Sequence, residues 1–173
     1  MNETLETMLA RKSCRSFKKE QIKDEELNAV IEAGLAAPSG RNLQPTLIIA
    51  VQDRETINKL SKLNAAVMGV ESDPFYGAPT VVVVLAKKSS RTSLEDGSLV
   101  LGNMLLAAYS IGLGSCWIHR ARETFESEEG KALLAEWGID GEVYGVGNCI
   151  LGYPAGDFHE DFLKDPDRAI VIK

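Results

Sequence analysis

The sequence has few of the residues that build metal sites and disulfide frameworks. Among its 173 residues are two histidines and three cysteines, Cys14, Cys116 and Cys149, and no two cysteines form a C-x-x-C pair. An odd number of widely spaced cysteines argues against a disulfide framework and indicates a reducing compartment. Because a structural zinc ion needs four Cys or His ligands close together, we expect no metal site.

Long apolar runs and an excess of basic residues are also missing. The longest apolar stretches, 80–86 and 99–111, are too short or too interrupted to cross a bilayer, and the acidic start of the chain does not resemble a secretory signal. The formal net charge of −6 disfavours general nucleic-acid binding, which needs a basic surface. We therefore expect a cytoplasmic protein whose partners include neither nucleic acid nor membrane.

The G-x-G-x-x-G fingerprint of dinucleotide-binding folds is absent as well. Two glycine pairs come near it, but Trp117 takes the place of the third glycine in the run 112–117, and Ile150 takes it in the run 145–150. A Rossmann-type nucleotide site is therefore excluded.

Length and composition favour one globular domain over residues 1–173, since 45% of the residues are hydrophobic and the chain can bury a sizeable core. Asp24 and Asp53 are the expected N-caps of two helices. The mixture of elements indicates the α+β class. Hydrophobic periodicity predicts helices at 3–11, 24–36, 53–64, 94–111 and from Ser127, and strands at 46–51, 80–86, 114–118 and 143–151.

Burial patterns distinguish these segments. Residues 80–86 form a β-branched run that is typical of a strand covered on both faces. The stretch 94–111 is apolar nearly all round, so we expect it to be buried in the core or against a second subunit. Its polar or small residues indicate close subunit contact with hydrogen bonds across the interface: Asp96, Gly97 and Asn103. The helix at 24–36 has one inward face, formed by Leu27, Val30, Ile31 and Leu35.

The segment R-K-S-C-R-S-F at 11–17 concentrates cations and hydroxyls. Alternate residues of an extended or turning backbone point to one side, so Arg11, Ser13 and Arg15 can converge on one anion. Two guanidinium groups and a hydroxyl form a directional phosphate site. The alternative is a solvated basic end of the first helix, favoured by the helix dipole.

A second polar segment, A-A-P-S-G-R-N-L-Q-P at 36–45, precedes a predicted strand, where ligand loops commonly lie. Asn42 carries both a donor and an acceptor, so it can match the N–H and carbonyl pattern of a heterocycle such as isoalloxazine. The alternative is an ordinary Ser/Gly/Asn turn, which accounts for 39–42 but not for the flanking residues.

Together these motifs resemble the nitroreductase family of flavoproteins. The family pattern R-x-S-x-R/K-x-F is matched at 11–17, and A-P-S-x-x-N-x-Q-P is matched at 37–45. Three further motifs follow in the family's order, and the resemblance covers essentially the whole chain: Gly77-Ala78-Pro79, Gly112-Leu113-Gly114 and Gly152-Tyr153-Pro154. The resemblance implies a three-layer α/β/α fold with a central, mainly antiparallel sheet, and a homodimer in which the C-terminal β-like run 169–172 is exchanged.

The resemblance also implies two FMN sites at the dimer interface. Arg11 and Ser13, with Lys12 between them, would hold the phosphate and ribityl chain, and Arg15 would lie near the pyrimidine edge of the flavin. Lys164 or Arg168 would supply a C-terminal phosphate contact. Four residues would follow the other part of the ring: Trp117, Ile118, His119 and Arg120. The polar loop would come from the partner subunit, with its cofactor contacts at Pro38, Ser39, Gly40, Asn42 and Gln44.

By the same resemblance, the protein is an FMN-dependent oxidoreductase. NAD(P)H would be the co-substrate, and a nitroaromatic compound, a quinone or another electron-poor small molecule would be reduced by a ping-pong hydride mechanism. The flavin carries the chemistry, so no catalytic side chain is required. Two alternatives stay open: a same-fold reductase of a specific metabolite, or a flavin-binding protein without turnover.

The sequence departs from the family pattern in two places. Thr46 stands where Trp is frequent, which affects local packing. His119 and Arg120 stand where many relatives of similar size have small glycines, and their bulk and charge would narrow the substrate cavity or select an anionic substrate.

Overall fold

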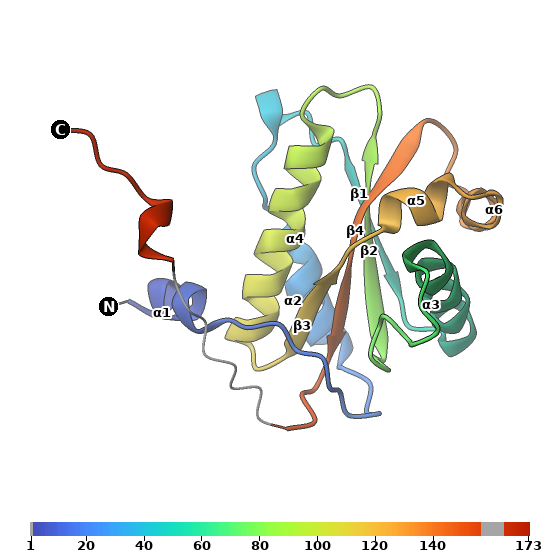
Figure 1. Cartoon of the computed structure of the whole chain (residues 1–173), viewed down its shortest axis with the longest axis horizontal. Coiled ribbons are helices and arrows are strands. Elements are labelled where there is room, and N and C mark those ends of the chain that lie inside the picture. Colours follow the sequence, from blue (N-terminus) through green and yellow to red (C-terminus); the bar gives the residue numbers. More distant parts are fainter. Residues whose placement is uncertain (1, 157–164) are drawn as a thin grey trace.

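In the computed structural model, residues 2–156 and 165–173 are described, and the two ends of the chain lie on the same side of a central sheet (Figure 1). The sheet has four strands in the order β1-β2-β4-β3, and every neighbouring pair is antiparallel. The strands are β1 (Thr46–Val51), β2 (Thr80–Lys87), β3 (Gly114–Ile118) and β4 (Val143–Gly152).

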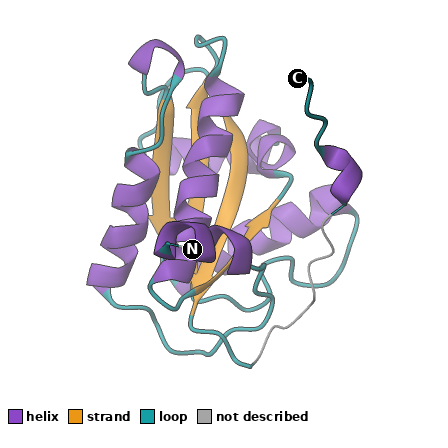
Figure 2. Cartoon of the chain, turned by 90° about the vertical axis from the view of Figure 1, so that its left-hand side faces the viewer, coloured by secondary structure: helices purple, strands orange, loops and turns teal. Residues whose placement is uncertain are grey.

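Helices cover both faces of the sheet. One face carries α2 and α4, with α1 beside them, and the other carries α3, α5 and α6 (Figure 1). Figure 2 views the molecule from the α4 side, with the sheet behind the helices. This three-layer arrangement confirms the predicted α+β class. The helices are α1 (Glu3–Ala10), α2 (Asp24–Leu35), α3 (Arg54–Met68), α4 (Ser93–Ser110), α5 (Ala121–Glu126) and α6 (Glu128–Glu136), with short 3₁₀ turns η1 (Gly40–Asn42) and η2 (Pro166–Arg168).

Strand β2 lies at the centre of two hydrophobic cores. Residues 80–86 are all buried, as the sequence predicts for a strand covered on both faces. Successive side chains of a strand point to opposite faces. Val82 and Val84 accordingly pack with Leu101 of α4, whereas Val81 and Val83 belong to the core beneath α3, α5 and α6.

The helix boundaries follow the sequence pattern with three corrections. Lys23, not Asp24, is the N-cap of α2, because the Glu26 carboxylate reaches back to accept from Lys23 N at 2.8 Å. The predicted Asp53 cap of α3 is confirmed, but this helix continues past residue 64 and stops where Gly69 adopts a φ of 70°.

The third correction is α5, a helix of six residues that the hydrophobic pattern does not predict. Ser127 is both the C-cap of α5 and the N-cap of α6, where its Oγ accepts from Gly130 N at 3.0 Å. A helix this short contains fewer than two turns, so it leaves little periodicity in the sequence.

Helix α4 spans the predicted stretch to within one residue. Its polar and small residues have partners within the same chain, and their expected place at a subunit interface stays a prediction. Asn103 Nδ2 donates to Ala33 O of α2 at 3.0 Å, and the Asp96 carboxylate accepts from Gly40 N at 2.9 Å. Gly97 packs against Val146 of β4. All three therefore find their partners within the same chain.

Several large apolar side chains remain exposed on the α1, α2 and α4 side of the molecule. The sequence predicts that Leu35 faces inward, but its side chain lies at the last residue of α2 and the residue is 60% exposed among the described parts of the chain. Further exposed apolar side chains on these three helices are Leu5, Met8, Leu9, Leu94 and Leu99.

The C-terminal tail does not join the sheet of its own chain. Ala169 has extended dihedrals, with φ −129° and ψ 125°, and Ile170, Val171 and Ile172 are 77% to 93% exposed. Figure 1 shows the tail running away from the body. A strand forms only beside another strand, so the expected exchange of residues 169–172 with a partner stays a prediction. Over the residues that the structure describes, no helix combines the length and apolarity required to cross a membrane.

Candidate functional site

The segment 11–17 lies along the start of β3, one of the two edge strands of the sheet. Cys14 N donates to Ser115 O at 2.8 Å, and Phe17 forms an isolated β-bridge with Pro154. Gly114 makes this approach possible, because a Cβ there would lie 2.6 Å from Cys14 Sγ. The segment is therefore anchored to the sheet at the point where β3 begins.

Burial of Cys14 decides which way its neighbours face. Cys14 is fully buried, while Ser13 is half-buried and Arg15 is exposed. Alternate residues of an extended segment share a side, so Ser13 and Arg15 lie on the outer side together with half-buried Arg11. Within the described ranges, none of Arg11, Lys12 and Arg15 takes part in an ion pair. Their convergence on one phosphate stays a prediction, but their charges are available to an anion.

The buried thiols are unsuited to act as nucleophiles. Burial raises the pKa of the Cys14 thiol above its ordinary value, and it raises the pKa of Cys149 much further. The reactive form of cysteine is the thiolate, which burial disfavours. Residues 2–156 and 165–173 also contain no group of three or more His, Cys, Asp or Glu side chains suited to a metal ion.

The end of β3 places Trp117 on the α4 side of the sheet and Ile118 on the opposite side, in the core beneath α5. The indole of Trp117 lies over Gly147, where a Cβ would be 2.5 Å from Nε1. This Nε1 is buried and has no hydrogen-bond partner among the residues described. Only the backbone of Ile118 can line a ligand, since its side chain is 7% exposed.

His119 and Arg120 follow β3 and are both exposed. Arg120 is the N-cap of α5 and has a φ of 76°, a conformation for which glycine is the usual choice. Its guanidinium Nη1 donates to Glu123 Oε1 at 2.8 Å, and this bond is the main cause of the lowered pKa of Glu123. Glycine at this position would adopt the same backbone conformation without strain.

The polar loop 38–44 lies at the opposite end of the sheet. The loop precedes Thr46 of β1, which pairs with Ala86 of β2, and Ala86 in turn pairs with Tyr144 near the start of β4. Gly114 of β3 pairs with Gly152 at the end of β4. Eight residues of β4 separate these positions, or about 26 Å at 3.3 Å per residue. Figure 1 shows η1 and the segment after α1 at opposite ends. The fold thus does not bring the two predicted cofactor segments together within one chain.

Within this loop, hydrogen bonds join the predicted cofactor residues to each other. Ser39 Oγ accepts from Gln44 N at 3.0 Å, and Gln44 Nε2 donates to Asn42 Oδ1 at 2.9 Å. Pro38 is exposed beside them, and Gly40 N is held by Asp96. The sequence identified Asp96 as a polar residue on an apolar helix, but nothing in its spacing connects it to residue 40.

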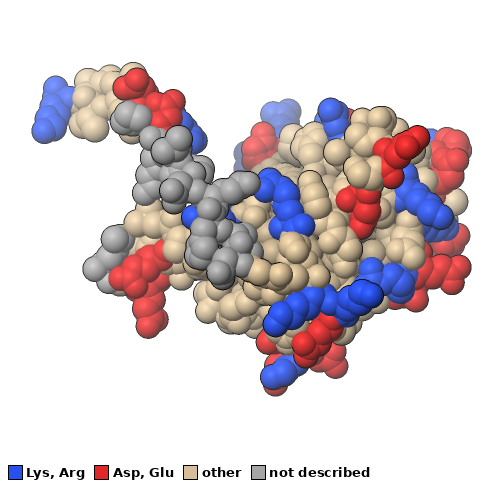
Figure 3. All heavy atoms as spheres, turned by 60° about the horizontal axis from the view of Figure 1, so that its bottom comes forward, with Lys and Arg blue, Asp and Glu red and all other residues tan. Residues whose placement is uncertain are grey.

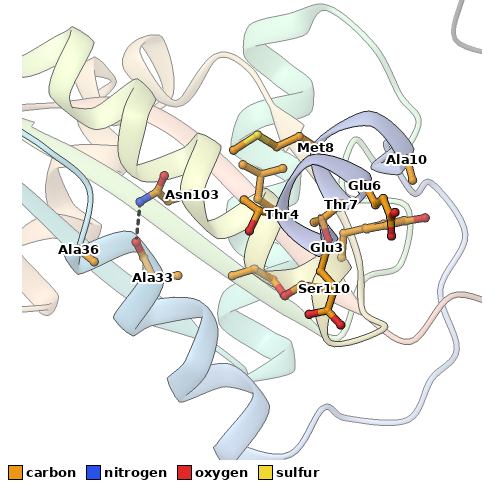
Figure 4. Close-up of a pocket in the computed structure, with 13 residues that line it drawn as sticks. Glu3, Thr4, Glu6, Thr7, Met8, Ala10, Ala33, Ala36, Asn103 and Ser110 are labelled. Atoms are coloured by element: carbon orange, nitrogen blue, oxygen red, sulfur yellow. Dashed lines mark hydrogen bonds between the residues drawn. The ribbon is translucent and has the colours of Figure 1, made fainter. Parts of the chain in front are cut away.

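A cavity of about 790 Å³ lies elsewhere, between α1, α2 and α4 (Figure 4). The carboxylates of Glu3 and Glu6 at this cavity disfavour a phosphate group. Two of its lining residues, Asn103 of α4 and Ala33 of α2, are joined by a hydrogen bond. None of the predicted cofactor residues lines it; the lining residues are Glu3, Thr4, Glu6, Thr7, Met8, Ala10, Ala33, Ala36, Asn103, Leu106, Ala107, Tyr109 and Ser110.

Two C-terminal residues, Lys164 and Arg168, are the alternatives for the predicted phosphate contact. Lys164 lies outside the described residues, and Arg168 is exposed at the end of η2. Figure 3 brings the lower end of the sheet forward and shows Lys and Arg side chains on that face, mixed with acidic ones. Among the described residues, the cations predicted to contact the phosphate are therefore Arg11 and Lys12 of segment 11–17, with Arg168 in the C-terminal part.

Comparison with known proteins agrees with this geometry. The family model "Nitroreductase family" matches residues 8–75 and 67–153. A protein of Archaeoglobus fulgidus with the provisional name NADH dehydrogenase/NAD(P)H nitroreductase is 35% identical over 175 residues, which is 97% of each chain. Solved structures of FMN-bound nitroreductases from Bacteroides fragilis and Desulfitobacterium hafniense match over the full length of both chains, with TM-scores of 0.92 and 0.90 and identities of 29% and 27%. The chain therefore belongs to the nitroreductase family.

Proposed function

We propose that residues 1–173 form one FMN-binding domain that uses NAD(P)H to reduce small electron-poor acceptors such as nitroaromatic compounds or quinones. Similar proteins support this assignment: both solved structures named above hold FMN, and a relative from Bacillus subtilis, 28% identical over 90% of this chain, is named FMN reductase [NAD(P)H]. The observation that carries it is the cationic segment 11–17, anchored beside the edge strand β3 with its charges available.

The residues present fit an FMN group at this edge. Arg11, Lys12 and Ser13 would hold the phosphate and ribityl chain, because guanidinium groups bind phosphate oxygens in a fixed geometry. Arg15 would hold negative charge at the pyrimidine edge of the ring. The bound FMN would supply the hydride-transfer chemistry between NAD(P)H and the acceptor. The chain supplies binding, orientation and electrostatic stabilisation, and no side chain needs to transfer a proton.

The complete site requires a second copy of the chain. The strand register separates the start of β1, which follows loop 38–44, from Gly114, beside segment 11–17, by about 26 Å along the sheet. We therefore infer that a flavin bound by segment 11–17 meets the loop of a partner. Exposed apolar side chains offer a surface for that partner on α1, α2 and α4: Leu5, Met8, Leu9, Leu35, Leu94 and Leu99. We infer a homodimer in which the apolar tail 169–172 pairs with the sheet of the other copy.

A more selective reductase is the second candidate, and Arg120 is the residue that favours it. The Arg120 guanidinium is half exposed and uses Nη1 to pair with Glu123, so its remaining N–H groups would attract a carboxylate or phosphate on the acceptor, and His119 beside it would narrow the site. Comparing anionic and neutral acceptors of similar size separates this candidate from broad nitroaromatic or quinone reduction. Replacing both residues with glycine should widen the acceptance of bulky compounds if they flank the flavin.

The absorbance spectrum of the purified protein, with and without NAD(P)H, tests the proposal directly. We expect a yellow protein with about one FMN per chain, since each chain carries one cationic segment. Addition of NADH or NADPH under anaerobic conditions should bleach it. A colourless protein that FMN does not reconstitute, or stoichiometric FAD, contradicts the cofactor assignment. A yellow protein that neither NADH nor NADPH bleaches is a flavin-binding protein without turnover.

A further inference from the structure

The loop Ser39–Gln44 has an unusual backbone. Three of its residues, Arg41, Asn42 and Gln44, have φ values of 53°, 55° and 47°. These values lie in the left-handed region, which L-residues enter at an energetic cost. Such a conformation persists only where the surroundings fix it, and it is concentrated at functional sites. The loop therefore needs contacts that hold it in place.

Contacts within the loop are solvent-exposed. The bonds from Gln44 N to Ser39 Oγ and from Gln44 Nε2 to Asn42 Oδ1 both lie at the surface, where water competes for the same groups. These two bonds shape the loop but do not connect it to the rest of the fold.

The connection to the fold is Asp96, in the first turn of α4. Its Oδ1 accepts from Gly40 N at 2.9 Å, and its Oδ2 accepts from Thr92 Oγ1 at 3.0 Å. Asp96 is only 4% exposed, and across the described part of the chain it has no ion-pair partner. The positive end of the α4 dipole favours its charge, and a charged acceptor makes the stronger hydrogen bond to the loop.

Gly40 is the residue that lets the loop reach this carboxylate. A Cβ at this position would lie 2.4 Å from Thr92 Oγ1 and 3.2 Å from Thr92 Cβ. Any side chain would therefore push the loop away from α4. The hydrogen bond between the loop and α4 therefore depends both on the absence of a side chain at Gly40 and on the buried carboxylate of Asp96.

We propose that Asp96 is the positioning residue of this loop: through Gly40 N, it fixes the conformation that presents Asn42 to the flavin ring bound by the second copy of the chain. The inference rests on the proposed function, which supplies the flavin and the second copy. Because Asp96 is only 4% exposed, we expect its effect on the flavin to pass through the loop.

Three variants test this role by FMN titration and by the visible spectrum of the bound flavin. Asp96→Ala removes both acceptors and should raise the Kd for FMN by about tenfold or more, the effect of a lost hydrogen bond to a charged group. Asp96→Asn keeps an oxygen for Gly40 N and should retain most of the affinity. Gly40→Ala should reproduce the spectrum and affinity of Asp96→Ala, because it breaks the same contact from the other side.

Asp73→Ala is the matched control. The Asp73 carboxylate also orders a loop, accepting from Phe75 N at 2.8 Å and from Gly77 N at 2.7 Å, but that loop precedes β2 and is distant in sequence from residues 39–44. The Asp73→Ala substitution should lower thermal stability and leave the FMN Kd and spectrum unchanged.

The outcomes separate this inference from the proposed function. A wild-type protein that does not bind FMN overturns both. A wild-type protein that binds FMN, with Asp96→Ala at the same Kd and spectrum or altered no more than Asp73→Ala, overturns only the role of Asp96. If Asp96→Ala does not fold, the comparison of Gly40→Ala with Asp73→Ala decides in the same way.

Discussion

The contact between Gly114 and Cys14 gives the sharpest test of how segment 11–17 is held. In Gly114→Ala the new Cβ would lie 2.6 Å from Cys14 Sγ and 2.8 Å from Cys14 Cβ, well below the usual separation of about 3.5–4.0 Å. Both partners are buried, and Cys14 N is bonded to Ser115 O, so the strain falls on the attachment of the segment to β3. Overpacking of this kind costs about 1–3 kcal/mol.

The expected result is a lower free energy of unfolding together with weaker FMN binding. Urea unfolding of the apoprotein measures the first quantity, and fluorescence titration with FMN measures the second. Displacing the segment moves Arg11, Ser13 and Arg15 together, so the Kd for FMN should rise by about tenfold or more, the equivalent of one charge-assisted contact.

A double-mutant cycle supplies the control. Cys14→Ala removes Sγ, the nearer of the two crowded atoms, so it should restore part of the stability and of the FMN affinity in the Gly114→Ala background. In the wild-type background the same change should only weaken packing. If the two substitutions act additively, or if Gly114→Ala alone leaves the FMN Kd unchanged, then this contact does not position the segment.

Four further predictions concern the site, the dimer and pH. Arg11→Ala should weaken FMN binding by about 2 kcal/mol, seen as a roughly 30-fold higher Kd by titration, and an unchanged Kd would exclude a phosphate contact. Arg120→Gly should keep FMN content while removing the salt dependence of turnover with anionic acceptors; an unchanged acceptor profile would place this side chain in solvent. Deleting residues 169–173 should lower the light-scattering mass toward that of one chain and reduce FMN content, whereas a stable dimer without them would refute strand exchange. The Tyr153 hydroxyl, 2.6 Å from Glu26, lowers the pKa of that carboxyl; Tyr153→Phe should therefore destabilise the fold at neutral pH, and the loss of stability should shrink as the pH falls through the lowered pKa.

The sign of the pH effect follows from the direction of the pKa shift. Glu26 titrates lower in the folded chain than its ordinary value of 4.5, mainly because Tyr153 donates to it. Its contribution to stability is therefore present above that value and is lost as the pH falls through the lowered one. Denaturant unfolding of wild type and Tyr153→Phe at several pH values would show two curves that converge in acid.

Local sequence patterns determined most of the secondary structure of this protein. The β-branched run at 80–86 specified the central strand, because such side chains suit a position between two helical layers. The carboxylate of Asp53 specified the start of α3, since a cap acts on amides only two or three residues away. The motifs at 11–17 and 37–45 were enough to suggest the nitroreductase family, which the comparisons confirmed.

Only the tertiary structure decided how these segments combine. Strand register put loop 38–44 and segment 11–17 at opposite ends of the sheet, although they are close in sequence. It also gave Asp96 and Asn103 partners in their own chain, and it left Leu35 exposed at the end of α2. These features depend on contacts between residues that are far apart in the sequence. Periodicity and capping act within a few residues, so they carry no information about such contacts.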